Sequence, residues 1–140
     1  MENVVAIDGP GGAGKSTIAR LLAKKLNYLH LDTGAMYRAV TLAALKNNLD
    51  FDAEDQLVEL AENIDITFDQ SGEIYLNGEN VSQDIRTAEV NEHVSQTAAV
   101  KGVREVLVKK QQQLAQNNMI VMDGRDITTV VLPEAEYKFF

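Results

Sequence analysis

A glycine-rich segment between an apolar run and a helical pattern restricts the fold of this chain more than any other feature. The segment reads IDGPGGAGKST over residues 7–17 and has four glycines in six positions. Glycine weakens helices and strands, so such a cluster requires a structural reason. Residues 4–7 read as a short buried strand and residues 16–26 as an amphipathic helix. The apolar residues at helical spacing in that helix are Ile18, Leu21, Leu22 and Leu26.

The order strand, glycine-rich turn and helix predicts a phosphate-binding loop, and the spacing Gly9, four residues, Gly14, Lys15, Ser16 agrees with it. Glycines let successive backbone N–H groups point into one concavity, where the helix N-terminus adds partial positive charge. Lys15 is expected to reach the outer phosphates of a nucleotide, and the Ser16 hydroxyl to bind Mg²⁺. The alternative is a glycine-rich turn with an ordinary surface lysine. The predicted ATP-binding residues are Gly9, Pro10, Gly11, Gly12, Ala13, Gly14, Lys15, Ser16 and Thr17.

Composition limits the classes of partner. The chain of 140 residues suits one domain, and 45% hydrophobic residues are enough for a core. The formal net charge of −8 argues against a nucleic-acid polymer as partner. No cysteine is present, so disulfides and thiolate metal sites are excluded. Because we find neither a signal peptide nor an apolar run of membrane-spanning length, we expect a cytoplasmic protein without a membrane partner, and a monomer.

Strand and helix patterns alternate along the chain, which favours an α/β fold with a parallel sheet. Residues 64–81 differ, because they contain short alternating segments and the strong hairpin signal Asn77-Gly78. We interpret this part as a small antiparallel insertion. The predicted strands cover residues 4–7, 28–31, 119–122 and 137–140, and the predicted helices cover residues 16–26, 35–46, 52–63, 87–96 and 99–116.

Asp123 follows an apolar strand, as the usual partner of a phosphate-binding loop does. Its carboxylate is expected to lie near Ser16 and to hold the Mg²⁺ shell, through water. The alternative is an aspartate at a strand end that caps the next turn. His30 is expected to pack in its strand and His93 to lie at the surface, and we assign neither a catalytic role.

Five segments resemble the family of bacterial cytidylate kinases: IDGPGGAGKST (7–17), LDTGAMYRA (31–39), LNGENVSQDIRTAEV (76–90), VSQTAAVKGVRE (94–105) and MDGRDITTVVLP (122–133). Their order and intervals also match, so the resemblance covers all 140 residues. It implies a P-loop NTPase fold, with a parallel sheet flanked by helices. It also implies a kinase core over residues 1–140, a monophosphate-binding insertion at residues 63–95 and a mobile lid.

The resemblance implies transfer of the γ-phosphoryl group of ATP to CMP or dCMP with Mg²⁺, in line and without a covalent enzyme intermediate. Arginine suits the acceptor phosphate because its planar group binds phosphate through two hydrogen bonds. Cytosine requires a carboxylate facing N4 and donors facing N3 and O2. The implied catalytic residues are Lys15, Arg38 and Arg125. The implied CMP-binding residues are Thr33, Arg38 and Arg125 at the phosphate, and Ser95, Arg104 and Asp126 at the base.

Each of these residues also has an ordinary interpretation. Arg38 and Arg104 could be solvated helix residues, Arg125 and Asp126 a local ion pair, and Ser95 a partner of the helix backbone. Two other functions stay open: a P-loop kinase for another small acceptor, such as UMP or shikimate, and a nucleotide-binding fragment without turnover.

The chain departs from the family in two places. Members usually read DGRDIGT where this chain reads DGRDITT, so Thr128 replaces a glycine and is expected to strain the loop or shift Asp126. Members also continue through the lid and a further strand, whereas this chain stops at Phe140. We therefore expect that the lid and last strand are absent and that the chain alone is weakly active or inactive.

Overall fold

The computed structural model describes residues 3–9 and 14–140. The chain divides into two compact units. We name them the sheet unit, which comprises Met1–Thr33, Phe68–Gly72 and Lys110–Phe140, and the helical unit, which comprises Gly34–Thr67 and Glu73–Lys109.

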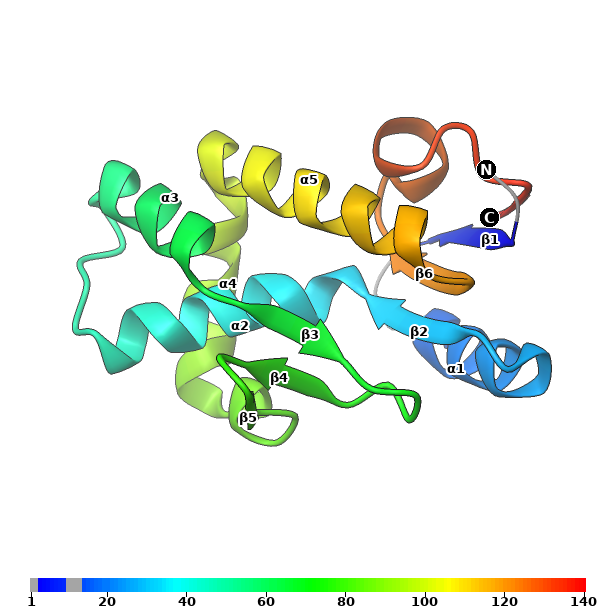
Figure 1. Cartoon of the computed structure of the whole chain (residues 1–140). Coiled ribbons are helices and arrows are strands. Elements are labelled where there is room, and N and C mark those ends of the chain that lie inside the picture. Colours follow the sequence, from blue (N-terminus) through cyan, green and yellow to red (C-terminus); the bar gives the residue numbers. More distant parts are fainter. Residues whose placement is uncertain (1–2, 10–13) are drawn as a thin grey trace. The chain divides into compact units, whose positions relative to one another are not determined.

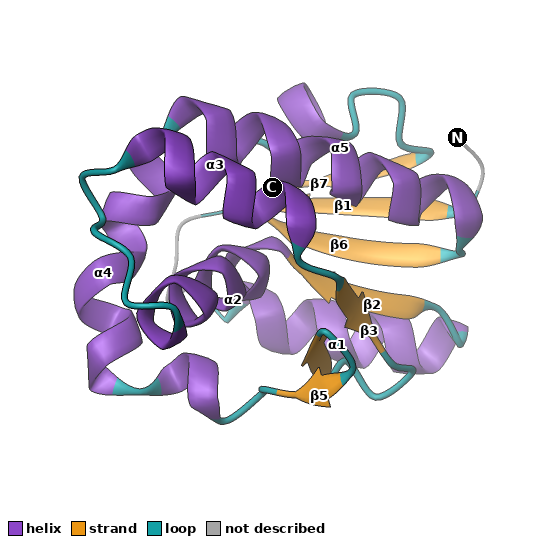
Figure 2. Cartoon of the chain, turned by 60° about the vertical axis from the view of Figure 1, so that its left-hand side comes forward, coloured by secondary structure: helices purple, strands orange, loops and turns teal. Residues whose placement is uncertain are grey.

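A four-stranded sheet forms the centre of the sheet unit. Its strands follow the order β2-β6-β1-β7, and β1 pairs in parallel with both β6 and β7, as β2 does with β6. Figure 2 shows the four strands side by side. The elements of this unit are β1 (Val4–Asp8), α1 (Lys15–Leu26), β2 (Leu29–Asp32), β6 (Ile120–Gly124), the π-helical turn η2 (Ile127–Val131) and β7 (Tyr137–Phe139).

The two central strands, β1 and β6, are buried on both faces, as strands of a parallel sheet usually are. On one face, Val5 and Ile7 of β1 and Val121 of β6 pack against Ala19 and Ala23 of α1. Because parallel strands end at the same edge, this packing places the last residues of β1, β2 and β6 beside the start of α1.

The buried face of α1 differs from the predicted one. Ile18, Leu21 and Leu26 are 61%, 60% and 41% exposed, so most of the apolar stripe that the sequence pattern indicated faces away from the sheet. The residues that pack on the sheet are Ala19, Ala23 and the partly buried Leu22. These positions form their own helical stripe, and the small alanines allow the helix axis to lie close to the strands.

Helices dominate the helical unit, together with a small sheet of strand order β3-β4-β5 (Figure 1). Helix α5 begins here, and its residues from Lys110 on belong to the sheet unit. The elements are α2 (Thr33–Lys46), α3 (Glu54–Asn63), β3 (Ile66–Phe68), β4 (Ile74–Leu76), β5 (Glu79–Asn80), the 3₁₀ turn η1 (Asp84–Arg86), α4 (Ala88–Ala99) and α5 (Lys101–Asn117).

The predicted antiparallel hairpin is confirmed. Strands β4 and β5 are antiparallel, and Asn77 and Gly78 between them have φ values of 50° and 84°. Two successive residues with positive φ are what a tight turn of type I′ requires, which explains the Asn-Gly pair. The predicted strands and helices are also found, with shifts of up to three residues at their ends. The turns η1 and η2 were not predicted.

Close packing within the helical unit explains one further glycine. A Cβ added at Gly102 of α5 would lie 2.5 Å from Cγ2 of Val58 in α3. The two helices therefore approach each other where α5 has no side chain. None of the described helices combines the length and hydropathy that a membrane crossing needs.

Candidate functional site

The start of α1 carries the described part of the predicted phosphate-binding loop. Gly14 precedes the helix with φ 74° and is exposed, so it adopts a left-handed conformation that suits glycine. Lys15 and Ser16 are the first residues of α1. The other predicted ATP-binding residues in this stretch, Pro10, Gly11, Gly12 and Ala13, lie outside the described residues.

Asp123 lies fully buried at the end of β6 and gathers three polar side chains. The Ser16 hydroxyl donates to Asp123 Oδ2 at 2.8 Å, and Lys15 Nζ lies 3.6 Å from the same oxygen. His30 Nε2, from β2, lies 2.6 Å from Asp123 Oδ1. The predicted proximity of Asp123 to Ser16 is thus confirmed, and His30 is an additional partner.

The surroundings keep Asp123 ionised. Burial alone would raise its pKa, but hydrogen bonds from His30 and Ser16 and electrostatic interactions with His30 and Lys15 together lower the pKa below its ordinary value. A buried ionised carboxylate beside a hydroxyl supplies hard oxygen ligands, the kind that Mg²⁺ prefers. The residues present therefore fit the predicted magnesium site.

Thr33, the first residue of α2 and directly after β2, lies next to this group. Its hydroxyl donates to the backbone carbonyl of Asp123 at 3.1 Å. A Cβ added at Gly124 would lie 1.9 Å from Thr33 Oγ1, so only glycine fits there. Thr33 and Gly124 thus bring the ends of β2 and β6 close together.

The loop after β6 presents Arg125 and Asp126 to solvent. Both side chains are exposed, and they line a cavity of about 600 Å³. The cavity residues are Asp8, Gly9, Arg125, Asp126, Thr129 and Phe140. Within the described part of the chain no ion pair joins Arg125 to Asp126, so the alternative of a local pair is not observed.

Thr128 itself does not adopt the left-handed conformation that a glycine at this position would suggest. The left-handed conformation in this loop falls on Asp126, with φ 58°, whereas Thr128 lies buried within η2. The backbone N–H of Thr128 donates to Asp8 Oδ2 at 3.1 Å, and its hydroxyl contacts the same oxygen. The threonine is accommodated because its hydroxyl has this partner.

The remaining predicted acceptor residues belong to the helical unit. Arg38 Nη1 donates to the carbonyl of Ile85 at 3.1 Å and contacts Asn91 Oδ1. Arg104 Nη1 donates to the carbonyls of Ala98 and Ala99, at 3.0 and 2.9 Å, and so caps the end of α4. Ser95 is exposed on α4. Both arginines thus have backbone partners and are more than solvated helix residues.

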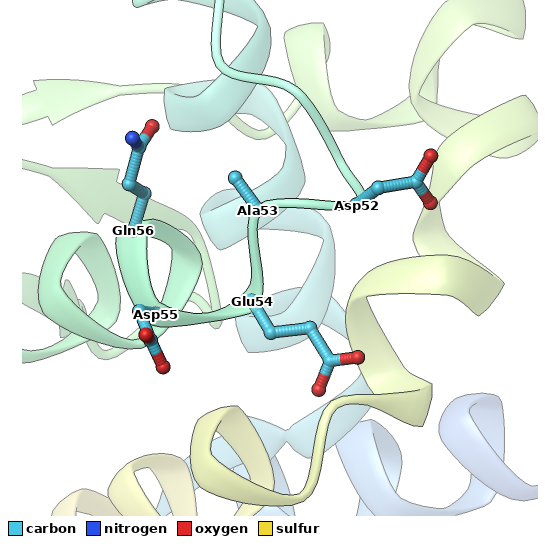
Figure 3. Close-up of a pocket in the computed structure, with 5 residues that line it drawn as sticks. All are labelled: Asp52, Ala53, Glu54, Asp55 and Gln56. Atoms are coloured by element: carbon cyan, nitrogen blue, oxygen red, sulfur yellow. The ribbon is translucent and has the colours of Figure 1, made fainter.

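An acidic hollow of about 550 Å³ lies at the start of α3 (Figure 3). Its side chains point in different directions, and Asp52 accepts a hydrogen bond from Gln96 at 3.2 Å. Glu54 and Asp55 stand in the first helical turn, where acidic side chains stabilise a helix. Among residues 3–9 and 14–140 no group of three His, Cys, Asp or Glu side chains suits a metal ion.

Sequence reasoning missed the roles of Asp8 and His30. His30 pairs in register with Val121, two residues before Asp123, so its side chain faces the same side of the sheet as the carboxylate. That neighbourhood depends on β2 lying beside β6, which no local pattern reveals. Asp8 stood within the quoted glycine-rich segment, but its partners lie about 120 residues further along.

Comparison with known proteins gives a consistent result. A sequence profile of the family described as cytidylate kinase matches residues 5–140. The curated cytidylate kinase of Clostridioides difficile (strain 630) is 50% identical over 137 residues, which are 98% of this chain and 63% of the relative. That of Caldanaerobacter subterraneus subsp. tengcongensis is 52% identical over 97% of this chain and 60% of the relative. That of Bacillus anthracis (strain A0248) is 53% identical over 97% of this chain and 62% of the relative. The chain thus spans about three fifths of the length of these relatives.

Proposed function

This chain belongs to the cytidylate kinase family, and we propose that the protein transfers the γ-phosphoryl group of ATP to CMP or dCMP. The observation that carries the proposal is the contact of Lys15 and Ser16, at the start of α1, with the buried Asp123. In proteins with a glycine-rich phosphate loop, a lysine binds the outer phosphates, and a hydroxyl and a strand-end carboxylate hold Mg²⁺.

On the donor side, Gly14 and the residues around it bind the phosphates of ATP, and Lys15 neutralises the outer phosphates. Ser16 and Asp123 hold Mg²⁺. Their hard oxygen atoms and the ionised state of Asp123 favour binding of this cation. When bound, Mg²⁺ supplies positive charge to the phosphate oxygens during transfer. Thr33 and His30 keep the Asp123 backbone and carboxylate oriented.

On the acceptor side, Arg125 and Asp126 bind CMP at the cavity that Gly9 also lines. Arg125 contacts the phosphate and Asp126 accepts a hydrogen bond from cytosine N4. Arg38 adds a phosphate contact, while Ser95 and Arg104 donate to the base. Because the acceptor phosphate is already anionic, the side chains orient it and neutralise charge, and no general base is needed.

An acceptor panel tests the proposal. ADP formation is followed with ATP, Mg²⁺ and CMP, dCMP, UMP, AMP or shikimate, and calorimetry measures the binding of each acceptor to the chain. We expect CMP and dCMP to be preferred, with UMP binding weaker by about 1–3 kcal/mol, the value of one good base contact. A preference for UMP or shikimate identifies another acceptor. If the chain binds ATP but binds none of the five acceptors, the proposal is contradicted.

A further inference from the structure

Asp8 is the last residue of β1 and directly precedes the glycine-rich segment. Its carboxylate accepts a hydrogen bond from the backbone N–H of Ile127 at 2.6 Å, through Oδ1. Its other oxygen, Oδ2, accepts from the backbone N–H of Thr128 at 3.1 Å and contacts the Thr128 hydroxyl. Both carboxylate oxygens of Asp8 are therefore directed at the loop that follows β6.

Ile127 and Thr128 are the first two residues of η2. The first N–H groups of a helical turn have no partner within the turn and are usually bound by the side chain of the preceding residue. Here that residue, Asp126, makes no such hydrogen bond. Asp8 binds these N–H groups instead, from a different strand, so the side chain of Asp126 is left free to face the cavity.

The backbone of Asp126 needs this support. Its φ of 58° and ψ of 26° are left-handed, a conformation that is uncommon for residues with a side chain. Such a conformation persists where the surrounding structure fixes both flanks. On one side, Gly124 is fixed by its pairing in β6 and by the hydrogen bond from Thr33 to the adjacent Asp123 carbonyl, and on the other side Asp8 fixes Ile127 and Thr128. Arg125 and Asp126 form the short link between these fixed ends.

We propose that Asp8 and Thr128 are positioning residues that set the acceptor specificity by holding Arg125 and Asp126 at the cavity. The inference rests on the proposed function, because it assumes that Asp126 reads the base. Asp8 acts through the backbone of η2, and the Thr128 hydroxyl directs the Asp8 carboxylate. Loosening this connection allows Asp126 to leave the geometry in which it discriminates cytosine from uracil.

The test uses Thr128→Val, which removes the hydroxyl and keeps the branched shape, and Thr128→Ser, which keeps the hydroxyl. Asp8→Asn replaces one acceptor oxygen by a donor that faces an N–H group. Thr67→Val makes the same chemical change as Thr128→Val at an exposed threonine of β3 and is the matched control. Calorimetry gives the affinities for CMP, UMP and ATP, and circular dichroism gives the folded fraction.

We expect Thr128→Val to lower the CMP-to-UMP affinity ratio about three- to tenfold, the range of one lost hydrogen bond. Asp8→Asn should lower it further, while Thr128→Ser and Thr67→Val keep it. The affinity for ATP should change less than that for CMP.

An unchanged CMP-to-UMP affinity ratio in folded Thr128→Val and Asp8→Asn overturns the inference. If either of these variants does not fold, equal ratios in Thr128→Ser and a folded Thr128→Ala overturn it instead. A wild-type chain without preference for CMP refutes the proposed function and is distinguishable from these results.

Discussion

Asp123 is the residue on which most of the described site depends. It is fully buried and ionised, and it has partners from α1 and β2. An ionised carboxylate in the interior is stable only when hydrogen bonds and opposite charges compensate for its lost hydration. Removal of a single partner should therefore be detectable in the stability of the whole fold.

The lowered pKa of Asp123 predicts a loss of stability in acid. A carboxyl whose pKa is lower in the folded than in the unfolded chain stabilises the fold above its unfolded value, near 3.8, and that stabilisation is lost as the pH falls through the folded value. Asp123→Asn should therefore flatten the decrease in unfolding free energy below about pH 4. Urea unfolding over a series of pH values measures this, with the exposed Asp84→Asn as control. Identical pH profiles for wild type and Asp123→Asn would contradict the prediction.

The hydrogen bond between His30 and Asp123 gives a second residue-scale prediction. His30→Leu leaves Asp123 Oδ1 buried without this partner, and hydrogen bonds to charged groups contribute about 1.5–3 kcal/mol. We expect His30→Leu to lower the unfolding free energy at neutral pH by about that amount. His30→Gln retains a donor and should lose less. Equal losses in the two variants would show that packing, and not the hydrogen bond, is what His30 contributes.

At the scale of elements, sequence patterns identified the strands and helices well, but they misplaced the buried face of α1. Large apolar residues mark a stripe through Ile18 and Leu21, whereas the helix packs through Ala19 and Ala23. The two stripes share Leu22, so helical spacing alone cannot separate them. Alanine carries little weight in a hydrophobic pattern, although its small side chain permits the closest approach to a sheet.

The same limit applies to the candidate site. The sequence predicted that Ser16 and Asp123 meet, because Ser16 belongs to the phosphate-loop motif and a strand-end carboxylate is the usual partner of such a loop. The contacts of His30 with Asp123 and of Asp8 with η2 depend on which strands are neighbours and on their register. Those long-range pairings are set by the packing of the whole sheet and have no local signal.

The packing of α1 predicts opposite responses at neighbouring positions. Leu21→Lys should change the unfolding free energy by no more than about 0.5 kcal/mol, because Leu21 is exposed. Ala23→Leu should lower it by about 1–3 kcal/mol, because added methylenes meet the packed face of the sheet. Thermal or urea unfolding of both variants decides between the two faces. A large loss in Leu21→Lys together with a tolerated Ala23→Leu would support the stripe that the sequence pattern suggested.

At the scale of the whole molecule, the chain carries a formal net charge of −8 while its proposed ligands are anions. Long-range attraction therefore does not favour binding, and recognition must come from local cations and backbone N–H groups. The proposed cationic residues come from both units, with Lys15 and Arg125 in the sheet unit and Arg38 and Arg104 in the helical unit. Donor and acceptor contacts rest on different residues, so they should be separable by mutation.

Lys15→Ala tests this separation. Loss of the charge at the outer phosphates should lower the transfer rate by at least about 10²-fold, whereas CMP affinity should stay close to that of wild type. Rates are measured by ADP formation and affinities by calorimetry. Lys25→Ala, an exposed lysine of the same helix, is the control. A parallel loss of CMP affinity in Lys15→Ala would show that the two substrates share this residue.

The turn between β4 and β5 has a consequence for the chemical lifetime of the protein. Gly78 has no side chain to shield its backbone nitrogen, which can attack the side-chain carbonyl carbon of the exposed Asn77 and release ammonia. Asn77 Oδ1 accepts a hydrogen bond from the backbone N–H of Asp65 at 2.9 Å, which holds the amide in place and opposes that attack. Completed hydrolysis would add one negative charge beside Asp65, on a chain that already carries −8. Stored protein should therefore accumulate a more acidic species by isoelectric focusing, and faster once the hairpin unfolds.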